Sequence, residues 1–251
     1  MNSSVPYDGY ARATFDALLS VLLAPPCAAC GEQLNHPTRG PVCDLCWRSI
    51  LPLTPPLCDA CGDPLPTWRT ISLTLARCAR CRRARRNIDK TRAVGAYEGA
   101  LRSIVHALKY EGRRSLAAPL AVLMRERGAH VLAGADAVVP VPLHPSRRRE
   151  RGFNQAADLA RHLGLRVSPA LRRVRATSAQ TGLAAAQRHR NVRNAFAPTR
   201  AAAALLDQTV VLVDDVSTTG ATLEACARAL KEAGIREVRA LTAARVVTLP
   251  R

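Results

Sequence analysis

The residues best suited to chemistry in this chain stand together in the stretch VVLVDDVSTTGAT, from Val210 to Thr222. An aliphatic run leads into two adjacent carboxylates, Asp214 and Asp215, which can accept hydrogen bonds from sugar hydroxyls or hold Mg²⁺. A loop of serine, threonine and glycine follows, and an apolar-periodic segment begins at Leu223. The pattern predicts a buried strand, a tight loop and a helix start. Because a helix N-terminus offers unpaired N–H groups and partial positive charge, we expect this loop to bind an anion the size of a phosphate.

The loop residues supply the groups that such an anion needs. Gly220 allows close approach of the backbone, and the hydroxyl side chains add hydrogen-bond donors. The predicted anion-binding residues are Ser217, Thr218, Thr219, Gly220, Ala221 and Thr222. An ordinary strand–turn–helix unit with a polar turn is the alternative, but the two carboxylates ahead of the loop favour a functional site.

The stretch has no Gly-Lys-Ser/Thr of a Walker A loop and instead resembles the signature by which type I phosphoribosyltransferases bind 5-phosphoribosyl 1-pyrophosphate (PRPP). This resemblance implies that Asp214 and Asp215 face the ribose hydroxyls and that residues 217–222 wrap the 5′-phosphate. PRPP also carries a pyrophosphate, so a second anion site is required.

The basic stretch VPVPLHPSRRRERGFNQA, from Val139 to Ala156, is the candidate for that second site. We expect a strand end, a basic loop and a helix from about Asn154. The residues predicted to bind the pyrophosphate are Ser146, Arg147, Arg148 and Arg149. A solvated basic loop is the alternative. Lys109 is either a second phosphate contact or a surface lysine, and His144 is either a donor or a turn histidine.

A long polar segment from Leu171 to Phe196 is rich in arginine and has no clear period. Long loops inside compact domains are usually functional, so we expect a long loop or flexible hairpin. The segment resembles the flexible catalytic loop of the phosphoribosyltransferases, which implies that it closes over the site. Its candidate residues are Arg172, Arg173, Thr177, Gln180 and Arg188. Gln180 and Arg188, together with the Asp214–Asp215 pair, form the predicted catalytic set.

Eight of the nine cysteines form four C-x-x-C pairs near the N-terminus: Cys27/Cys30, Cys43/Cys46, Cys58/Cys61 and Cys78/Cys81. Four thiolates at this spacing hold one tetrahedral Zn²⁺, so eight predict two structural zinc sites. We favour sequential pairing, with the first two pairs at one zinc and the last two at the other, while a cross-braced arrangement stays open. Redox use is the alternative, and four repeated pairs argue against it. The ninth cysteine, Cys226, lies at helical spacing from Leu223 and Leu230 and is expected in the core.

A parallel α/β sheet would bring these segments together. Apolar strands are expected at 93–97, 137–141, 210–213 and 237–247, with a short one at 165–167, and amphipathic helices lie between them. Ligands of such sheets bind at the carboxyl ends of the strands, where Asp214 and the 142–152 loop fall. We expect an N-terminal helix and a double zinc-ribbon module over residues 1–90, with a phosphoribosyltransferase-like domain over 91–251. In the N-terminal helix, Phe15 and Leu18 belong to a face predicted to contact the core.

The composition sets limits on partners and location. The chain has 251 residues and a net charge of +18, carried mostly by arginine, which favours polyanionic partners unless it reflects a GC-rich genome. The arginine cluster between Arg77 and Arg92 is a nucleic-acid patch or, as we favour, a solvated linker. Aromatic residues make up only 4% of the chain, which weakens a base-stacking interpretation. No membrane span or signal peptide is expected, so the cytoplasm is the default location.

Taken together, the cysteine-rich N-terminus, LKYEGR, the basic stretch and VVLVDDVSTTGAT resemble the ComF family, known from DNA uptake and natural transformation. The resemblance covers the chain from about Leu18 to Val246. It implies a PRPP- and Mg²⁺-dependent pentosyl transfer in the cytoplasm, associated with incoming single-stranded DNA and its uptake machinery, such as a helicase. The acceptor of the phosphoribosyl group cannot be read from the residues. The alternative function is a non-catalytic, PRPP-sensing protein that binds single-stranded DNA.

Overall fold

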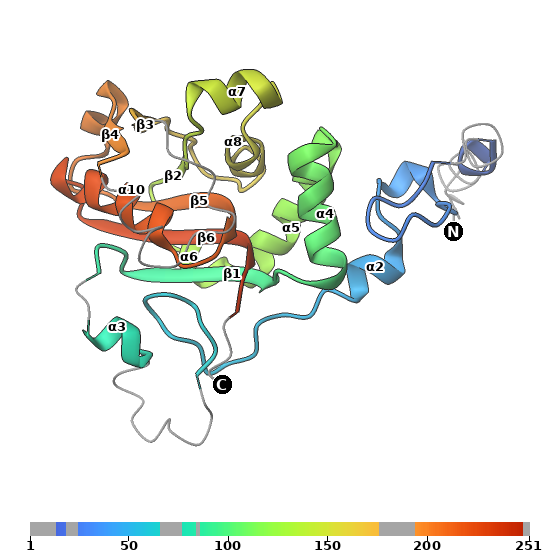
Figure 1. Cartoon of the computed structure of the whole chain (residues 1–251), viewed down its shortest axis with the longest axis horizontal. Coiled ribbons are helices and arrows are strands. Elements are labelled where there is room, and N and C mark those ends of the chain that lie inside the picture. The colour runs from blue at the N-terminus through green and yellow to red at the C-terminus, as the bar shows by residue number, and fades with distance from the viewer. Residues whose placement is uncertain (1–13, 19–24, 66–76, 84–85, 176–193, 248–251) are drawn as a thin grey trace, which may run out of the picture.

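The computed structural model describes residues 14–18, 25–65, 77–83, 86–175 and 194–247 (Figure 1). At its centre is a four-stranded sheet with the order β1-β6-β5-β2. The strands are β1 (Lys90–Ala96), β2 (Ala137–Pro140), β5 (Thr209–Ser217) and β6 (Glu237–Arg245). All three pairings are parallel, which confirms the predicted sheet.

Helices cover both faces of this sheet, because the central strands are apolar on both sides. On one face, Val211 and Val213 pack with α4 (Gly99–Tyr110), α5 (Ala117–Arg127), α6 (Ala129–Leu132) and α8 (Gln155–Ala160). On the other face, Val210 and Leu212 pack with α10 (Ala221–Glu232), where Cys226 is fully buried as expected. The two cores hold β5 rigidly, so its carboxyl end is a firm support for a site.

The long arginine-rich segment begins with β3 (Leu171–Arg173) and ends with β4 (Phe196–Pro198), and these two strands pair as a small antiparallel hairpin. This agrees with the hairpin alternative, while Thr177, Gln180 and Arg188 lie outside the described residues. Two short 3₁₀ helices, η3 (Arg114–Leu116) and η4 (Arg200–Leu205), complete the connections. In place of a strand at 165–167 there is one isolated bridge, from Val167 to Val138.

The basic stretch after β2 is a helix, so the prediction of a basic loop was wrong. This helix, α7, runs over Pro145–Arg151. His144 caps it by accepting a hydrogen bond from the Ser146 N–H at 3.3 Å, and Pro145 at the first position suits a helix start. Gly152 ends it with φ of +75°. The start and stop signals therefore outweigh the like charges of four arginines.

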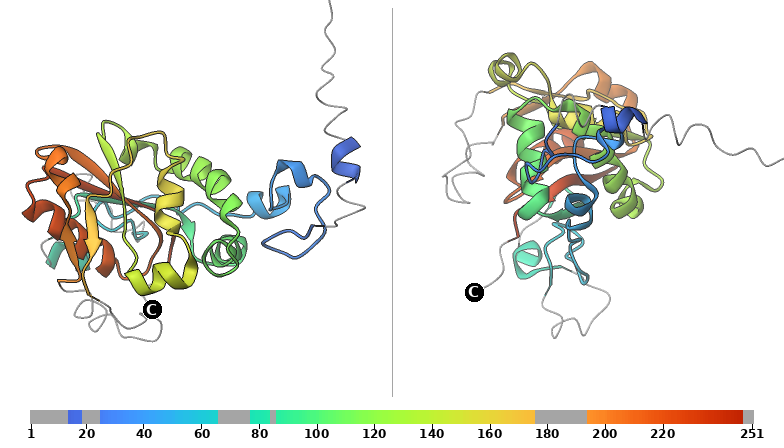
Figure 2. Two further views of the ribbon diagram at one scale, coloured as in Figure 1. Left: turned by 90° about the horizontal axis from the view of Figure 1, so that it is seen from above. Right: turned by 90° about the vertical axis from the view of Figure 1, so that its right-hand side faces the viewer.

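The four C-x-x-C pairs form two separate clusters. The sulfur atoms of Cys27, Cys30, Cys43 and Cys46 lie within 4.8 Å of one another, as do those of Cys58, Cys61, Cys78 and Cys81, which confirms sequential pairing. The first ribbon includes η1 (Pro37–Arg39) and α2 (Asp44–Arg48), and the second includes α3 (Ala79–Arg83). Figures 1 and 2 show the first ribbon beyond α4, at one end of the molecule, and the second below β1.

The first ribbon shares the core of the α/β domain, whereas the second has a small cluster of its own. Leu34, Val42 and Ile50 of the first ribbon belong to the same buried cluster as Leu101 and Ile104 of α4. The helical residues 14–18 do not follow their prediction. Phe15 and Leu18 are 55% and 54% exposed, while Asp16 is buried and accepts a hydrogen bond from the Thr38 N–H at 2.8 Å.

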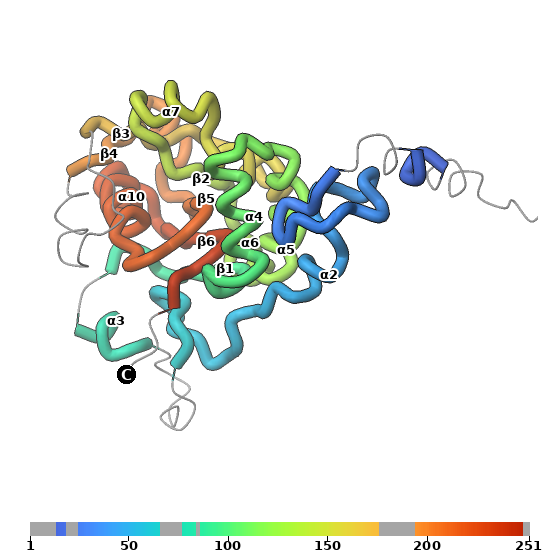
Figure 3. The backbone as a smooth tube through the Cα atoms, turned by 45° about the vertical axis from the view of Figure 1, so that its right-hand side comes forward, coloured from blue at the N-terminus to red at the C-terminus, as the bar shows by residue number. Residues whose placement is uncertain are grey.

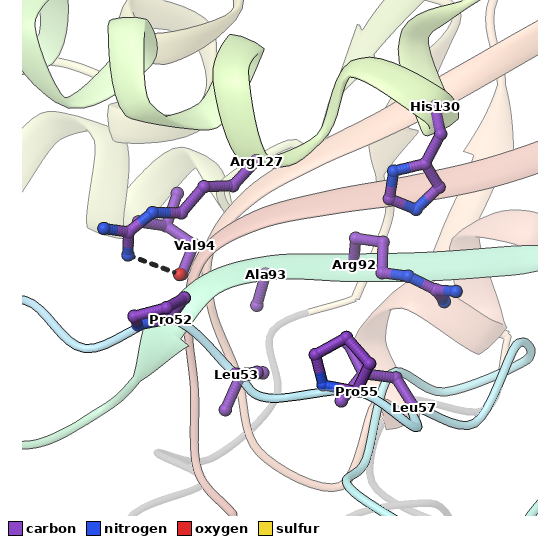
Figure 4. Close-up of a pocket in the computed structure, with 9 residues that line it drawn as sticks. All are labelled: Pro52, Leu53, Pro55, Leu57, Arg92, Ala93, Val94, Arg127 and His130. Atoms are coloured by element: carbon purple, nitrogen blue, oxygen red, sulfur yellow. Dashed lines mark hydrogen bonds between the residues drawn. The ribbon is translucent and has the colours of Figure 1, made fainter.

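An extended linker, residues 51–57, joins the two ribbons and lies against the edge strand β1 (Figure 4). Arg127 of α5 holds the start of this linker at β1, because it donates to the carbonyl oxygens of Ile50, directly before the linker, at 3.0 Å and of Val94 at 2.9 Å. A Cβ on Gly95 would lie 2.5 Å from the Leu51 carbonyl oxygen, so only glycine fits there. The linker and β1, together with Arg127 and His130, line a cavity of about 340 Å³. No described helix is long and apolar enough to cross a bilayer.

Candidate functional site

A cavity of about 280 Å³ lies at the carboxyl ends of β2 and β5, between α4, α7, α8 and the start of α10. Its lining includes Asp214, Asp215, Thr218 and Thr222 from the motif after β5, together with Lys109, Arg147 and Arg173. The parallel sheet explains this meeting, because strand ends on one edge bring distant segments together. Carboxylates and cations thus share one cavity, as a sugar phosphate with bound metal would require.

The carboxylate pair is held by backbone and lysine contacts. The Asp215 N–H donates to Asp214 Oδ1 at 2.9 Å, and the Val216 N–H donates to Asp215 Oδ1 at 2.6 Å. Lys109 Nζ lies 2.8 Å from Asp215 Oδ1, and both side chains are mostly buried. Lys109 therefore belongs to the site and is not a surface lysine.

The two carboxylates are electrostatically different. Burial and the charge of Asp215 raise the pKa of Asp214 from 3.8 to about 7. Burial acts to lower the pKa of Lys109, but the charges of Asp215 and Asp214 outweigh it and the pKa is raised. The lysine is thus a fixed cation beside Asp215, while Asp214 can take up or release a proton near neutral pH.

A cationic wall faces the carboxylates. Arg147 and Arg151 stand one turn apart on α7 and both line the cavity, as does Arg173 of β3. The Arg151 guanidinium lies 5.0 Å from the centre of the Tyr110 ring, close enough for a cation–π contact. Burial and the neighbouring charge of Arg147 lower the pKa of Arg173. This wall suits the more highly charged end of a ligand.

The structure separates the remaining predicted residues from this cavity. Ser217 is buried, and its Oγ accepts a hydrogen bond from Arg245. Thr219 and Gly220 border a small space on the side of the second ribbon. Ala221 is buried at the first position of α10, and its N–H donates to Thr219 Oγ1 at 3.4 Å.

On α7, Ser146 is exposed and pairs with His144, 2.7 Å from its Nδ1. His144 is thus a helix cap. Arg148 and Arg149 line a neighbouring basic groove of about 520 Å³, which also includes Arg172 and Arg173.

Several cavity residues were not predicted. Tyr97, Tyr110, Arg151, Asn154 and Gln155 line it, and Asn154 also caps α8 while its Nδ2 donates to the Val141 carbonyl oxygen at 3.1 Å. The four-residue spacing of Arg147 and Arg151 would have indicated Arg151 once the segment was assigned as a helix. Tyr97 lies far from the motif in sequence, and no local signal identifies it.

The two cysteine clusters fit structural zinc. Each offers four sulfur ligands, the donor set of a closed tetrahedral site. Cys27 Sγ accepts from the N–H groups of Ala29 at 3.4 Å and Cys43 at 3.3 Å, and Cys58 Sγ accepts from the Cys78 N–H at 3.3 Å. Such N–H donors favour a thiolate, the form that binds metal.

The arginine cluster between Arg77 and Arg92 is not one surface patch. Arg82 and Arg83 are exposed on α3. Arg86 is instead largely buried, with its Nη1 3.8 Å from Glu224 Oε2, and Arg92 pairs with Asp59 at 3.1 Å. The buried members therefore act as contacts between the second ribbon and the α/β domain.

Two family models match this chain. The model described as phosphoribosyl transferase domain matches residues 149–247, and the one described as double zinc ribbon domain matches residues 18–82. The first match spans β5, α10 and β6, which carry the carboxylate pair and its loop. The second spans both cysteine clusters.

Curated relatives match along most of their length. Competence protein F of Haemophilus influenzae is 30% identical over 223 residues, which cover 85% of this chain and 93% of that protein. DNA utilization protein YhgH of Salmonella typhi is 36% identical over 209 residues, which cover 79% of this chain and 87% of the relative. The Escherichia coli K12 protein of the same name is 31% identical over 216 residues, covering 78% and 94%.

Proposed function

Since this chain belongs to the ComF family, that of competence protein F and DNA utilization protein YhgH, we propose that it binds PRPP with Mg²⁺ and transfers ribose 5-phosphate to an acceptor during DNA uptake. One observation carries the proposal: a carboxylate pair, a helix N-terminus and an arginine wall face one another across a single cavity. The relatives' names supply the setting of competence and DNA use.

Different cavity residues suit different parts of PRPP. The hydroxyls of Thr218 and Thr222 and the N–H groups at the start of α10 suit the 5′-phosphate. Asp214 and Asp215 suit the ribose hydroxyls and Mg²⁺, which supplies charge neutralisation for the pyrophosphate when bound. Lys109 holds Asp215 in place, and the arginines of α7 lie on the side left for the pyrophosphate.

Transfer breaks the bond between C1 of the ribose and the pyrophosphate oxygen, which leaves with the electron pair. A nucleophile on the acceptor forms the new bond to C1 and gives up its proton. In this scheme the chain stabilises the leaving charge with Arg147, Arg151 and Arg173. Gln180 and Arg188, which lie outside the described residues, are the further catalytic residues of this proposal.

Calorimetry with PRPP and Mg²⁺ tests the binding step. We expect wild type to bind, and Asp215→Asn and Thr218→Ala to bind more weakly, because each removes a group that lines the cavity. Glu232→Gln, at the exposed far end of α10, is the matched control and should bind like wild type. If Asp215→Asn and Thr218→Ala bind PRPP as tightly as wild type and the control, the PRPP site lies elsewhere. Pyrophosphate release with nucleobases or oligonucleotides as acceptors then tests transfer.

The second candidate is a PRPP sensor that binds single-stranded DNA without turnover. The basic groove lined by Arg148, Arg149 and Arg172 favours it, because this groove opens beside the cavity and carries charge that the carboxylates do not neutralise. PRPP binding with no pyrophosphate release for any acceptor would support the sensor and count against the transferase.

A further inference from the structure

Arg245, the last residue of β6, is a fully buried arginine directly behind the phosphate-binding loop. Its side chain is 2% exposed. A guanidinium at this depth requires an anionic partner, and Nε donates to Asp63 Oδ1 at 2.5 Å. Nη1 donates to Ser217 Oγ at 3.2 Å. One side chain therefore joins the second zinc ribbon to the residue at which the loop begins.

Asp63 is held in place by the second ribbon. The Cys58 N–H donates to the Asp63 carbonyl oxygen at 2.8 Å, so the residue belongs to the turn that carries Cys58 and Cys61. Arg80, next to Cys81 on α3, donates to Asp63 Oδ2 at 2.9 Å. The backbone of Asp63 and its Oδ2 atom are thus held by segments that the four cysteines bring together, and Oδ1 is left for Arg245.

The second ribbon is also docked on β1, the edge strand that pairs with β6. The Thr91 N–H donates to the Asp59 carbonyl oxygen at 3.0 Å, and Thr91 Oγ1 donates to that of Ala60 at 2.8 Å. A Cβ on Gly62 would lie 3.0 Å from the Thr91 carbonyl oxygen, which shows how closely the two backbones approach. Figure 3 shows the end of β6 running down beside this ribbon.

The backbone at Arg245 and Val246 contacts two segments that border the cavity. The Val246 N–H donates to the Ser217 carbonyl oxygen at 2.9 Å, and the Tyr97 N–H donates to the Arg245 carbonyl oxygen at 2.7 Å. Tyr97 lines the cavity, while Ser217 precedes Thr218. A displaced Arg245 would therefore shift the loop and one wall of the cavity together.

We propose that Arg245 is a positioning residue for the phosphate-binding loop and that the second zinc ribbon fixes it through Asp63. In this arrangement the zinc held by Cys58, Cys61, Cys78 and Cys81 is coupled to recognition of the 5′-phosphate. The first ribbon, at the other end of the molecule, has no such contact among the described residues. The inference rests on the proposed PRPP site and assigns one zinc ribbon a part in it.

We call the contact of Asp63 with Arg245, and through it with Ser217, the brace. Two ligands that each represent one end of PRPP test it. Asp63→Asn keeps the size of the side chain but removes the charge that pairs with Arg245. We expect its Kd for ribose 5-phosphate to rise about tenfold, or about 1.4 kcal/mol, and its Kd for pyrophosphate to stay unchanged. Asp44→Asn, beside the first cysteine cluster, should bind both ligands like wild type. Unchanged ribose 5-phosphate binding, or an equal loss for both ligands, would overturn the brace.

Zinc removal gives a second comparison. Cys78→Ser and Cys43→Ser each remove one half-buried ligand, from the second and the first cluster respectively. Only Cys78→Ser should weaken ribose 5-phosphate binding, and equal effects of the two variants count against the inference. The rate of amide hydrogen exchange at residues 218–222 tests the brace in the absence of ligand. We expect this rate to increase in Asp63→Asn. If it does, yet wild type binds no ribose 5-phosphate, the proposed function fails and the brace is only a structural contact.

Discussion

At the scale of single residues, the charge state of Asp214 affects both the stability of the fold and the charge of the cavity. Its ordinary pKa of 3.8 is raised to about 7 because this half-buried carboxyl is poorly solvated and lies beside Asp215. The unfolded chain loses this proton near its ordinary pKa, and the folded chain keeps it until about neutral pH. Between these two pKa values the folded chain binds a proton that the unfolded chain has released. The free energy of unfolding therefore falls as the pH rises through this range.

Asp214→Asn should therefore stabilise the folded chain above pH 7 and have no effect near pH 4 or below. The gain expected at pH 8 is about 2 to 4 kcal/mol, because each pKa unit corresponds to about 1.4 kcal/mol. Asparagine keeps the oxygen that accepts from the Asp215 N–H, so the fold should survive. Denaturant unfolding of both proteins at the two pH values measures this. A variant that is less stable at pH 8 would show that Asp214 is ionised and stabilising there.

The residue scale is also where the sequence predicted most and missed most. Asp214, Asp215, Thr218 and Thr222 are contiguous, so one local pattern was enough to place them in a common site. Ser217 belongs to the same pattern, yet its hydroxyl meets Arg245, 28 residues further along the chain. That contact arises because β5 and β6 pair in parallel with Ser217 opposite Arg245. A local pattern carries no information on such a register.

At the scale of elements, α7 decides which arginines line the cavity. In a loop, the three consecutive arginines would be equivalent, as the sequence led us to expect. In a helix, positions one turn apart share a face, so Arg147 and Arg151 line the cavity while Arg148 and Arg149 line the neighbouring groove. His144 and Gly152 are helix start and stop signals that the sequence contains, but the run of like charges favoured the assignment of a loop.

Arg147→Ala and Arg151→Ala should each weaken PRPP binding about tenfold or more, since a charge-assisted hydrogen bond contributes about 1.5 to 3 kcal/mol. Arg148→Ala, on the same helix but outside the cavity lining, should change PRPP affinity less than threefold, or about 0.7 kcal/mol. Calorimetry of the three variants at one salt concentration makes the comparison. Equal losses for all three would mean that the basic stretch acts through its total charge, as the loop model implied.

At the scale of the whole molecule, the two zinc ribbons have different attachments. The cysteine spacing predicted two sites, but it could not predict that the first ribbon joins the core of α4 while the second docks below β1. These attachments depend on a linker fastened by Arg127 and on a glycine opposite Leu51, both remote in sequence from the cysteines. The first ribbon therefore shares a buried core with α4, and the second is joined to β1 by hydrogen bonds.

Purified protein should contain close to two Zn²⁺ per chain by elemental analysis, because each cluster is a complete set of four thiols. Cys46→Ser should lose one of them and also lower the melting temperature of the α/β domain. The reason is that Leu34, Val42 and Ile50 of the first ribbon are buried against α4 and lose their scaffold without metal. Loss of zinc with an unchanged melting temperature would show that the first ribbon adds nothing to the domain core.

The net charge of +18 bears on the choice between transferase and DNA-binding sensor. If single-stranded DNA follows the groove beside the cavity, its affinity should fall steeply with salt, by about 0.7 in log–log slope for each phosphate contact. Replacing Arg148, Arg149 and Arg172 with glutamine should then flatten the slope by about 2.

The matched control replaces Arg82 and Arg83, which are exposed on α3, far from that groove. If this control flattens the slope and the groove variant does not, the DNA-binding surface belongs to the second ribbon. Asp214→Asn should leave the slope unchanged, because Asp214 lines the proposed PRPP cavity and not the groove. No detectable binding at low salt would remove the sensor and leave the arginines of α7 to PRPP alone.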